Sequence, residues 1–354
     1  SLVRFTGVNR LRVEVRAGSE NPVDHYAEWR AAGCPTGTDP ASVRWLQNQY
    51  VTVNDNTDST IDVRGFHFTE LDATIENVVI PLRTRLEAKG EDLHVNVCYV
   101  AFTGQNMGGT YIHDQPNEYA EFVSAVYQHL KTKWNIVPDR WEAVLEPDRV
   151  SQWTASKLGA ALDAAALRLR TDGIEPSFIA PSTSNTSNTI PWAKEIIAYP
   201  YAKAAMKELS YHRDSDSNGV NEYATWRLAD SLNIRISMLG SSPENSGPDA
   251  MMNDAIRLNG AVWQQGSIEG FFDISRQGDS LNIVRKRNAV VTGIFSRFVR
   301  PGAVRIFSCR GVVMRNMDGS VVGYQWPPYM PVLSSGWTTG EVEYIRVDSL
   351  VQEH

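Results

Sequence analysis

The chain has 354 residues, of which 42% are hydrophobic and 21% charged, a composition typical of a globular protein with a sizeable core. The formal charge of −7 and the isoelectric point near 5.6 argue against a nucleic-acid partner, because no basic stripe is present to neutralise phosphates. No apolar run approaches the length of about eighteen residues that a membrane-spanning helix needs, so we expect no membrane partner.

Predicted strands and helices alternate along most of the chain. The first predicted strand lies in GVNRLRVEVRAGSEN (7–21), where apolar positions alternate before a Gly/Ser/Asn loop. Helical apolar spacing follows, and each helix leads to an apolar strand. These helix and strand pairs are 71–90 with 93–102, 118–134 with 141–146, and 156–173 with 176–183.

The second half of the chain continues this alternation. Its predicted elements are a strand at 208–216, a helix at 221–232, a strand at 234–240, a helix at 249–258 and a strand at 260–266. Seven strands with helices between most of them predict an α/β fold, a parallel (β/α)8 TIM barrel over residues 1–298. The barrel's first strand is not evident, and it lies either outside this chain or in its tail.

Residues 299–354 differ from the rest in pattern. Strand-forming residues alternate there with Gly, Asp and Pro turns, and no helical period is present. We therefore predict a small C-terminal β-rich appendage packed on the barrel.

Glu146 ends the apolar strand of WEAVLEPDR (141–149), and Pro147 stops the strand directly after it. In (β/α) barrels the catalytic residues lie at the C-terminal ends of strands, where the βα loops gather. Glu146 is therefore a catalytic candidate. The alternative is a structural carboxylate that caps a helix or pairs with an arginine.

Several segments together resemble clan A retaining glycoside hydrolases, and most closely family 30. They are GVNRLRVEVRAGSEN, VLEPD, ELSYHRD, IRISMLG, GAVWQQG and FSRFVRPGAVRI, between about residues 7 and 310. The last is the most specific match, because in that family such a segment leads from the last barrel helix into a β-sandwich flank. Family members usually place Asn before the acid/base glutamate, whereas this chain has Leu145.

The resemblance implies a retaining β-glycoside hydrolase that cleaves an oligo- or polysaccharide by double displacement, with two carboxyl groups about 5 Å apart. Glu146 would be the acid/base, with a pKa raised toward neutrality. The nucleophile should end the seventh strand, where the sequence has Gly240. Either Gly240 replaces it, through engineering or natural loss, or Glu244 in the next loop supplies the carboxylate, or the site lies elsewhere.

Six further residues have roles that the resemblance implies. Arg12 would hold the nucleophile ionised, with a salt bridge to Glu14 as the alternative. The other five would contact the sugar or shape the cleft, with core packing or structural hydrogen bonding as the alternative: Tyr99, His113, Tyr211, His212 and Trp263.

No metal or organic cofactor is expected. The three cysteines are widely spaced, and the seven histidines form no HxxxH or HExxH pattern. The first ten residues lack a signal-peptide pattern, yet the presumed polymeric substrate favours a secreted or extracellular protein. A carbohydrate-binding barrel without activity is the alternative function, and a barrel lyase or isomerase with Glu146 as base is a third. Nothing in the chain indicates an oligomeric state.

Overall fold

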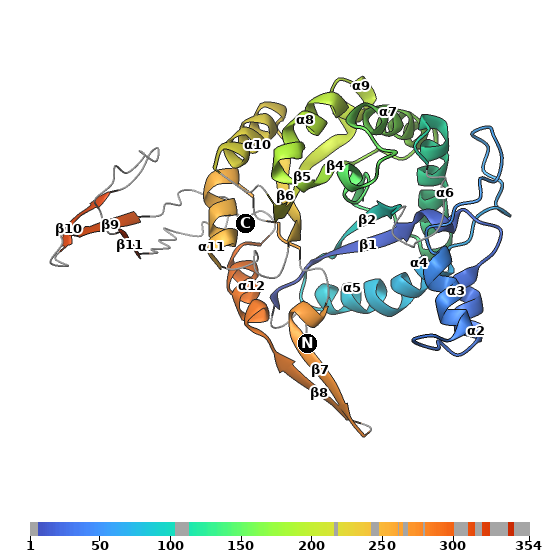
Figure 1. Cartoon of the computed structure of the whole chain (residues 1–354), viewed down its shortest axis with the longest axis horizontal. Coiled ribbons are helices and arrows are strands. Elements are labelled where there is room, and N and C mark those ends of the chain that lie inside the picture. Colours follow the sequence, from blue (N-terminus) through green and yellow to red (C-terminus); the bar gives the residue numbers. More distant parts are fainter. Residues whose placement is uncertain are drawn as a thin grey trace.

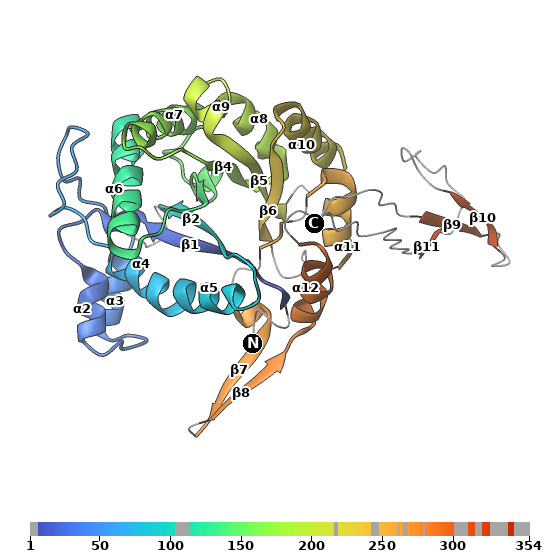
Figure 2. The ribbon, with the colours of Figure 1, turned by 180° about the vertical axis from the view of Figure 1, so that it is seen from behind.

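The computed structural model describes residues 6–102, 113–215, 219–241, 248–260, 262–264, 268–278, 280–300, 311–315, 321–325 and 339–342. Six parallel strands form one sheet in chain order. They are β1 (Arg10–Arg16), β2 (His94–Val100), β3 (Arg140–Glu142), β4 (Phe178–Asn185), β5 (Met206–Ser215) and β6 (Arg235–Ser241). Figures 1 and 2 show that the sheet is curled, with most helices on its outer side.

Helices lie at each of the five predicted positions, and others were not predicted. Those along the barrel are α4 (Thr69–Thr74), α5 (Ile80–Glu87), α6 (Pro116–Trp134), α7 (Ala155–Thr171), α8 (Thr186–Ile196), α9 (Pro200–Ala205), α10 (Gly219–Leu232), α11 (Pro248–Asn253) and α12 (Arg287–Phe298). The helices that were not predicted include α8, α9 and α12. Two more, α2 (His25–Ala31) and α3 (Pro40–Asn48), lie in the long connection after β1. Local signals set their ends: Thr154 caps α7 by accepting from the Lys157 amide, and Asn135 ends α6 in the left-handed conformation.

A seventh position continues the sheet beside β6. The amide of Met238 donates to Val262 O, and the amide of Gln264 donates to Met238 O, both at 3.0 Å. Trp263 thereby pairs with Met238 in parallel, as predicted for the last barrel strand. The described residues hold no strand between this position and β1, so they form an incomplete barrel, and the closed eight-stranded barrel stays a prediction.

The sequence analysis did not predict the hairpin before α12. Its strands, β7 (Phe272–Gln277) and β8 (Ser280–Arg285), pair antiparallel and project from the barrel in Figure 1. Beyond α12, three short strands form a separate antiparallel sheet, namely β9 (Gly311–Arg315), β10 (Val321–Gln325) and β11 (Thr339–Val342). These strands agree with a β-rich appendage, and its packing on the barrel stays a prediction.

The two faces of the sheet bury different chemistry. The outer face is apolar, and on β2 the side chains of Val95, Val97 and Tyr99 join the cluster formed with the helices. The inner face carries charge, because Arg10 binds both Glu208, at 2.8 Å, and Asn96, at 2.9 Å. Branched aliphatic residues usually fill such interiors, so the polar interior is a distinctive property of this chain.

Candidate active site

Glu146 lies at the C-terminal edge of the sheet in a constrained backbone. Glu146 follows β3, and its amide donates to the carbonyl oxygen of Ser182 at a distance of 3.0 Å. Both residues have left-handed φ angles, 49° for Glu146 and 54° for Ser182. Such angles in residues other than glycine cost energy and are frequent at functional sites. The contacts around Glu146 therefore hold its side chain in one defined place.

The carboxylate of Glu146 is partly exposed and receives two cationic partners. His212 Nδ1 lies 2.9 Å from Oε1, and Arg149 Nε lies 3.3 Å from Oε2. Burial raises the pKa of Glu146, but the hydrogen bond and charge of His212, followed by the charge of Arg149, bring the pKa below its ordinary value. The carboxylate is thus ionised at neutral pH, and the predicted rise of its pKa was wrong.

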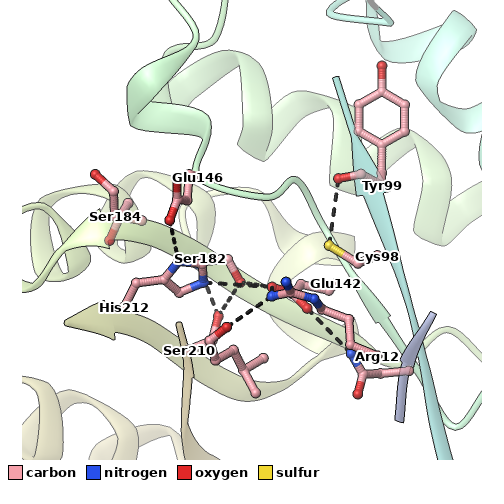
Figure 3. A network of polar contacts seen from close by, with 12 residues as sticks. Arg12, Cys98, Tyr99, Glu142, Glu146, Ser182, Ser184, Ser210 and His212 are labelled. Carbon is pink, nitrogen blue, oxygen red and sulfur yellow. Dashed lines mark hydrogen bonds and ion pairs between the residues drawn. The ribbon is translucent and has the colours of Figure 1, made fainter. Parts of the chain in front are cut away.

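His212 lies on β5 between two carboxylates, as Figure 3 shows. Its Nε2 is 3.9 Å from Oε1 of Glu142, an ion-pair distance too long for a hydrogen bond. Burial lowers the pKa of His212, but the two carboxylates outweigh burial and raise the pKa above its ordinary value. The His212 ring is fully buried and contacts Glu146 from the interior of the barrel.

Glu142 is the second carboxylate of this site, and the sequence analysis missed it. It is fully buried, and it accepts from Ser182 Oγ at 2.9 Å and from Asn96 Nδ2 at 3.3 Å. Burial raises its pKa, yet the charge of Arg12, 3.8 Å away, together with His212 and Ser182, brings the pKa below its ordinary value. A charged residue within an apolar strand was the available signal, because such residues are buried only with partners.

Gly240 lies at the tip of β6, where it pairs with His212 across the sheet. A Cβ atom added to Gly240 would stand 2.5 Å from Nδ1 and 2.7 Å from Cγ of the imidazole. Contacts this short do not occur, so the ring occupies the space where any side chain at 240 would begin. Gly240 and Glu146 are thus neighbours separated by one imidazole ring.

Arg12 approaches the same tip from β1. Its Nη1 donates to the carbonyl oxygen of Leu239 at 2.9 Å, and its Nη2 lies 3.4 Å from Glu14. The expected alternative, a salt bridge to Glu14, is therefore present beside the contact with β6. The role that the resemblance implies for Arg12, support of an ionised nucleophile, stays a prediction, and Glu244 lies outside the described residues.

Tyr99 and His113 lie on the other face of the sheet. The Tyr99 hydroxyl is 2.8 Å from His113 Nδ1, and His113 Nε2 pairs with Glu20. Both rings are fully buried against Phe122 of α6, at centroid distances of 5.2 and 4.5 Å. The alternation of β2 directs Tyr99 toward the helices, and the expected contribution of both residues to the cleft stays a prediction.

Tyr211 and Trp263 also face the helix layer. The Tyr211 hydroxyl donates to Asp254, which follows α11, and Trp263 Nε1 donates to the same carboxylate at 2.8 Å. Trp263 also packs edge-on against Phe295 of α12, with 5.7 Å between centroids. Contact of these two rings with the sugar stays a prediction, and their shared bond to Asp254 ties the seventh position of the sheet to β5.

Metal-binding clusters and membrane-spanning helices are both absent from the part of the chain that the structure describes. Within it, no three His, Cys, Asp or Glu side chains are grouped so that they could hold a metal ion. None of the helices described is both long and apolar enough to span a membrane.

Comparison with known proteins gives likeness in fold alone. No protein-family model and no curated protein matches the sequence. The structure is similar to the catalytic domain of GH30 xylanase C from Talaromyces cellulolyticus, with a TM-score of 0.51 and 13% identity over 88% of this chain and 72% of that one. It is also similar to SrfJ from Salmonella typhimurium, with a TM-score of 0.51 and 16% identity over 82% of this chain and 75% of that one.

A third similar structure is a conserved exported protein from Bacteroides fragilis, with a TM-score of 0.50 and 12% identity over 90% of this chain and 84% of that one. The expected resemblance to glycoside hydrolase family 30 is therefore confirmed for the fold. At these identities it assigns no residue a role.

Proposed function

We propose that this chain acts on carbohydrate as a barrel of the glycoside hydrolase type, with an oligo- or polysaccharide held at the strand ends around Glu146. The observation that carries this proposal is the placement of one partly exposed carboxylate, in a strained backbone and fixed by His212, at that edge of the sheet. In glycoside hydrolysis a carboxyl group placed in this way protonates the glycosidic oxygen.

Retaining hydrolysis would need a second carboxylate about 5 Å from Glu146. Gly240 cannot supply it, and Glu244 is the nearest acid along the chain after β6. Glu146 would also need a proton, since its lowered pKa keeps it ionised. The imidazolium of His212, hydrogen-bonded to Glu146, would be the donor. In this form of the proposal Glu146 is the acid/base and Glu244 the nucleophile.

A barrel that binds carbohydrate without cleaving it is the second candidate. Two observations favour it: the His212 ring fills the space at Gly240, and Glu146 is ionised by its neighbours. An ionised carboxylate beside an imidazolium accepts hydrogen bonds from sugar hydroxyls and needs no nucleophile.

Hydrolysis and binding assays on purified protein test both candidates. Aryl β-glycosides and oligosaccharides would be assayed for turnover, and the oligosaccharides for binding by calorimetry, with Glu146→Gln, Glu244→Gln and the exposed-site control Glu175→Gln. A hydrolase would lose roughly 10²- to 10⁴-fold in kcat in the first two variants and nothing in the control. Binding weakened by Glu146→Gln, without turnover in any protein, indicates the binding barrel. Absence of both binding and turnover contradicts the proposal.

A lost nucleophile can be tested by restoring it with space for its side chain. Gly240→Glu alone would collide with the His212 ring, so we expect no hydrolysis from this single variant. The double variant Gly240→Glu/His212→Ser removes the ring that occupies the space. Turnover of an aryl β-glycoside by the double variant would support a lost nucleophile at position 240. Because His212→Ser also removes the proposed proton donor, the assay uses a dinitrophenyl glycoside, whose leaving group needs no proton, and inactivity of a folded double variant on this substrate would contradict a lost nucleophile.

A further inference from the structure

Glu142 is a charged group for which the proposed sugar site has no use. Its side chain is fully buried one layer below Glu146, so it touches no substrate. Burial of a carboxylate is costly unless partners compensate, and this carboxylate remains ionised, with a lowered pKa. Because this burial is costly, we expect the Glu142 carboxylate to have a role within the protein.

The contacts of Glu142 fix its carboxylate firmly. Ser182 from β4 donates to Oε1 at 2.9 Å, and Asn96 from β2 donates to Oε2 at 3.3 Å. Arg12 from β1 adds positive charge at 3.8 Å. Three different strands thus hold one carboxylate at a single point inside the barrel.

The carboxylate of Glu142 faces Nε2 of His212. Nε2 is buried and has no hydrogen-bond partner, and Oε1 of Glu142 is 3.9 Å from it. A neutral ring that donates from Nδ1 would leave Nε2 as a buried acceptor with no donor, which is unfavourable. A protonated ring instead directs its Nε2–H toward the charge of Glu142, which favours the imidazolium.

The other groups around the ring agree with this arrangement. Glu146 accepts from Nδ1, and Arg149 holds the other oxygen of Glu146. Arg12 is the opposing cation and is itself neutralised by Glu142. Gly240, which lies opposite His212 on β6, carries no charge and leaves room for the ring.

We propose that Glu142 is a positioning residue, which holds the protonated His212 imidazole so that its Nδ1–H points at Glu146. The proposal deepens the proposed function, since it rests on Glu146 as the group that meets the sugar. The buried charge of Glu142 thus keeps the protonated Nδ1 of His212 at 2.9 Å from the partly exposed carboxylate of Glu146.

The protonation of His212 can be measured by nitrogen NMR without any carbohydrate. The chain has seven histidines, and the signal of His212 is the one that His212→Gln removes. In the native protein at pH 6 we expect both ring nitrogens to carry protons. A neutral ring at that pH overturns the proposal, and this measurement needs no variant of Glu142.

The variant Glu142→Gln then tests the cause. Loss of the buried charge should lower the pKa of His212 by about one unit or more, because an opposite charge at this range favours the protonated form. Glu14→Gln is the matched control, since Glu14 also contacts Arg12 but lies exposed on the same strand. An unchanged His212 pKa in a folded Glu142→Gln protein overturns the proposal. Failure of sugar binding with the expected titration would instead overturn only the proposed function.

Discussion

Two buried glutamates of this chain have opposite pKa shifts, and their partners explain the difference. Glu142 has a serine, an asparagine and an arginine around its carboxylate, and its pKa is lowered. Glu121 on α6 is 2% exposed, and neither of its oxygens has a hydrogen-bond partner. Burial, together with the nearby acid Asp55, raises the pKa of Glu121 to about 8. One residue type thus stays ionised in one place and protonated in the other.

Glu121 should make the protein less stable as pH rises. In the unfolded chain a glutamate loses its proton near pH 4.5, whereas in the folded protein Glu121 keeps it to about pH 8, so stability falls between these values. Glu121→Gln should remove this loss and raise the free energy of unfolding at pH 8 by roughly 1–3 kcal/mol relative to the native protein. Urea unfolding at pH 5 and pH 8 checks the prediction.

The control for Glu121→Gln is Glu195→Gln, an exposed acid on α8 that should leave the slope unchanged. Some slope should persist in Glu121→Gln, because His212 has a raised pKa. Its contribution is complete below its ordinary pKa of 6.5 and is lost as pH rises through the raised value. Parallel pH curves for the native protein and Glu121→Gln would contradict the assigned role of Glu121.

At the scale of elements, the ends of β5 and β6 shape the site. Their pairing shifts register between Tyr211 and His212, so that His212 lies opposite Gly240. The extra residue of this irregularity, Leu239, lies in β6, whereas Tyr211 and His212 face opposite layers through the ordinary alternation of a strand. Tyr211 bonds to Asp254 on the helix side, whereas His212 meets Glu146.

Gly240→Ala should disturb this junction strongly. The added methyl group would stand 2.5 Å from Nδ1 of a fully buried ring, so we expect a loss of about 1–3 kcal/mol in the free energy of unfolding, as for other overpacked cores. The same change at Gly260 is the control, because its nearest neighbour, Ile236 Cγ2, would be 3.6 Å away. Urea unfolding of both variants provides the test, and equal midpoints would show that His212 moves aside freely.

At the scale of the whole molecule, charged pairs connect strands across the inside of the barrel. Arg10 on β1 binds both oxygens of Glu208 on β5, at 2.8 and 3.1 Å, although 198 residues separate them. Glu208 is 2% exposed, and burial is opposed by Arg10, which brings the pKa of Glu208 below its ordinary value. The Arg10–Glu208 pair therefore links the first and fifth strands of an open sheet.

Removing one member of this pair should be costly. Glu208→Ala leaves the half-buried guanidinium of Arg10 without its main partner, and we expect a loss of about 2–4 kcal/mol in the free energy of unfolding. The double variant Arg10→Met/Glu208→Leu should recover most of that loss, because apolar residues of similar volume often replace a buried ion pair well. Chemical denaturation of the three proteins measures this. A double variant no more stable than Glu208→Ala would contradict the explanation.

Much of the architecture was predictable from local pattern. The helical period marked α6, α7 and α10, and the apolar runs near them marked the strands of the parallel sheet. The strand-end place of Glu146 followed from the proline after it. The hairpin β7–β8 was missed although the sequence pair Gly-Asp at 278–279, between two stretches of strand-forming residues, is a recognisable hairpin signal.

By itself the sequence determined the alternation of helices with the strands of the parallel sheet and the edge of the sheet where Glu146 lies, because these depend on residues close together in the chain. Only the tertiary structure decided which side chains meet there. Both faces of this sheet are buried, so alternation alone could not tell that Tyr99 faces the helices while His212 faces the interior. The partner that lowers the pKa of Glu146 lies 66 residues away along the chain, and folding alone brings the two within 2.9 Å.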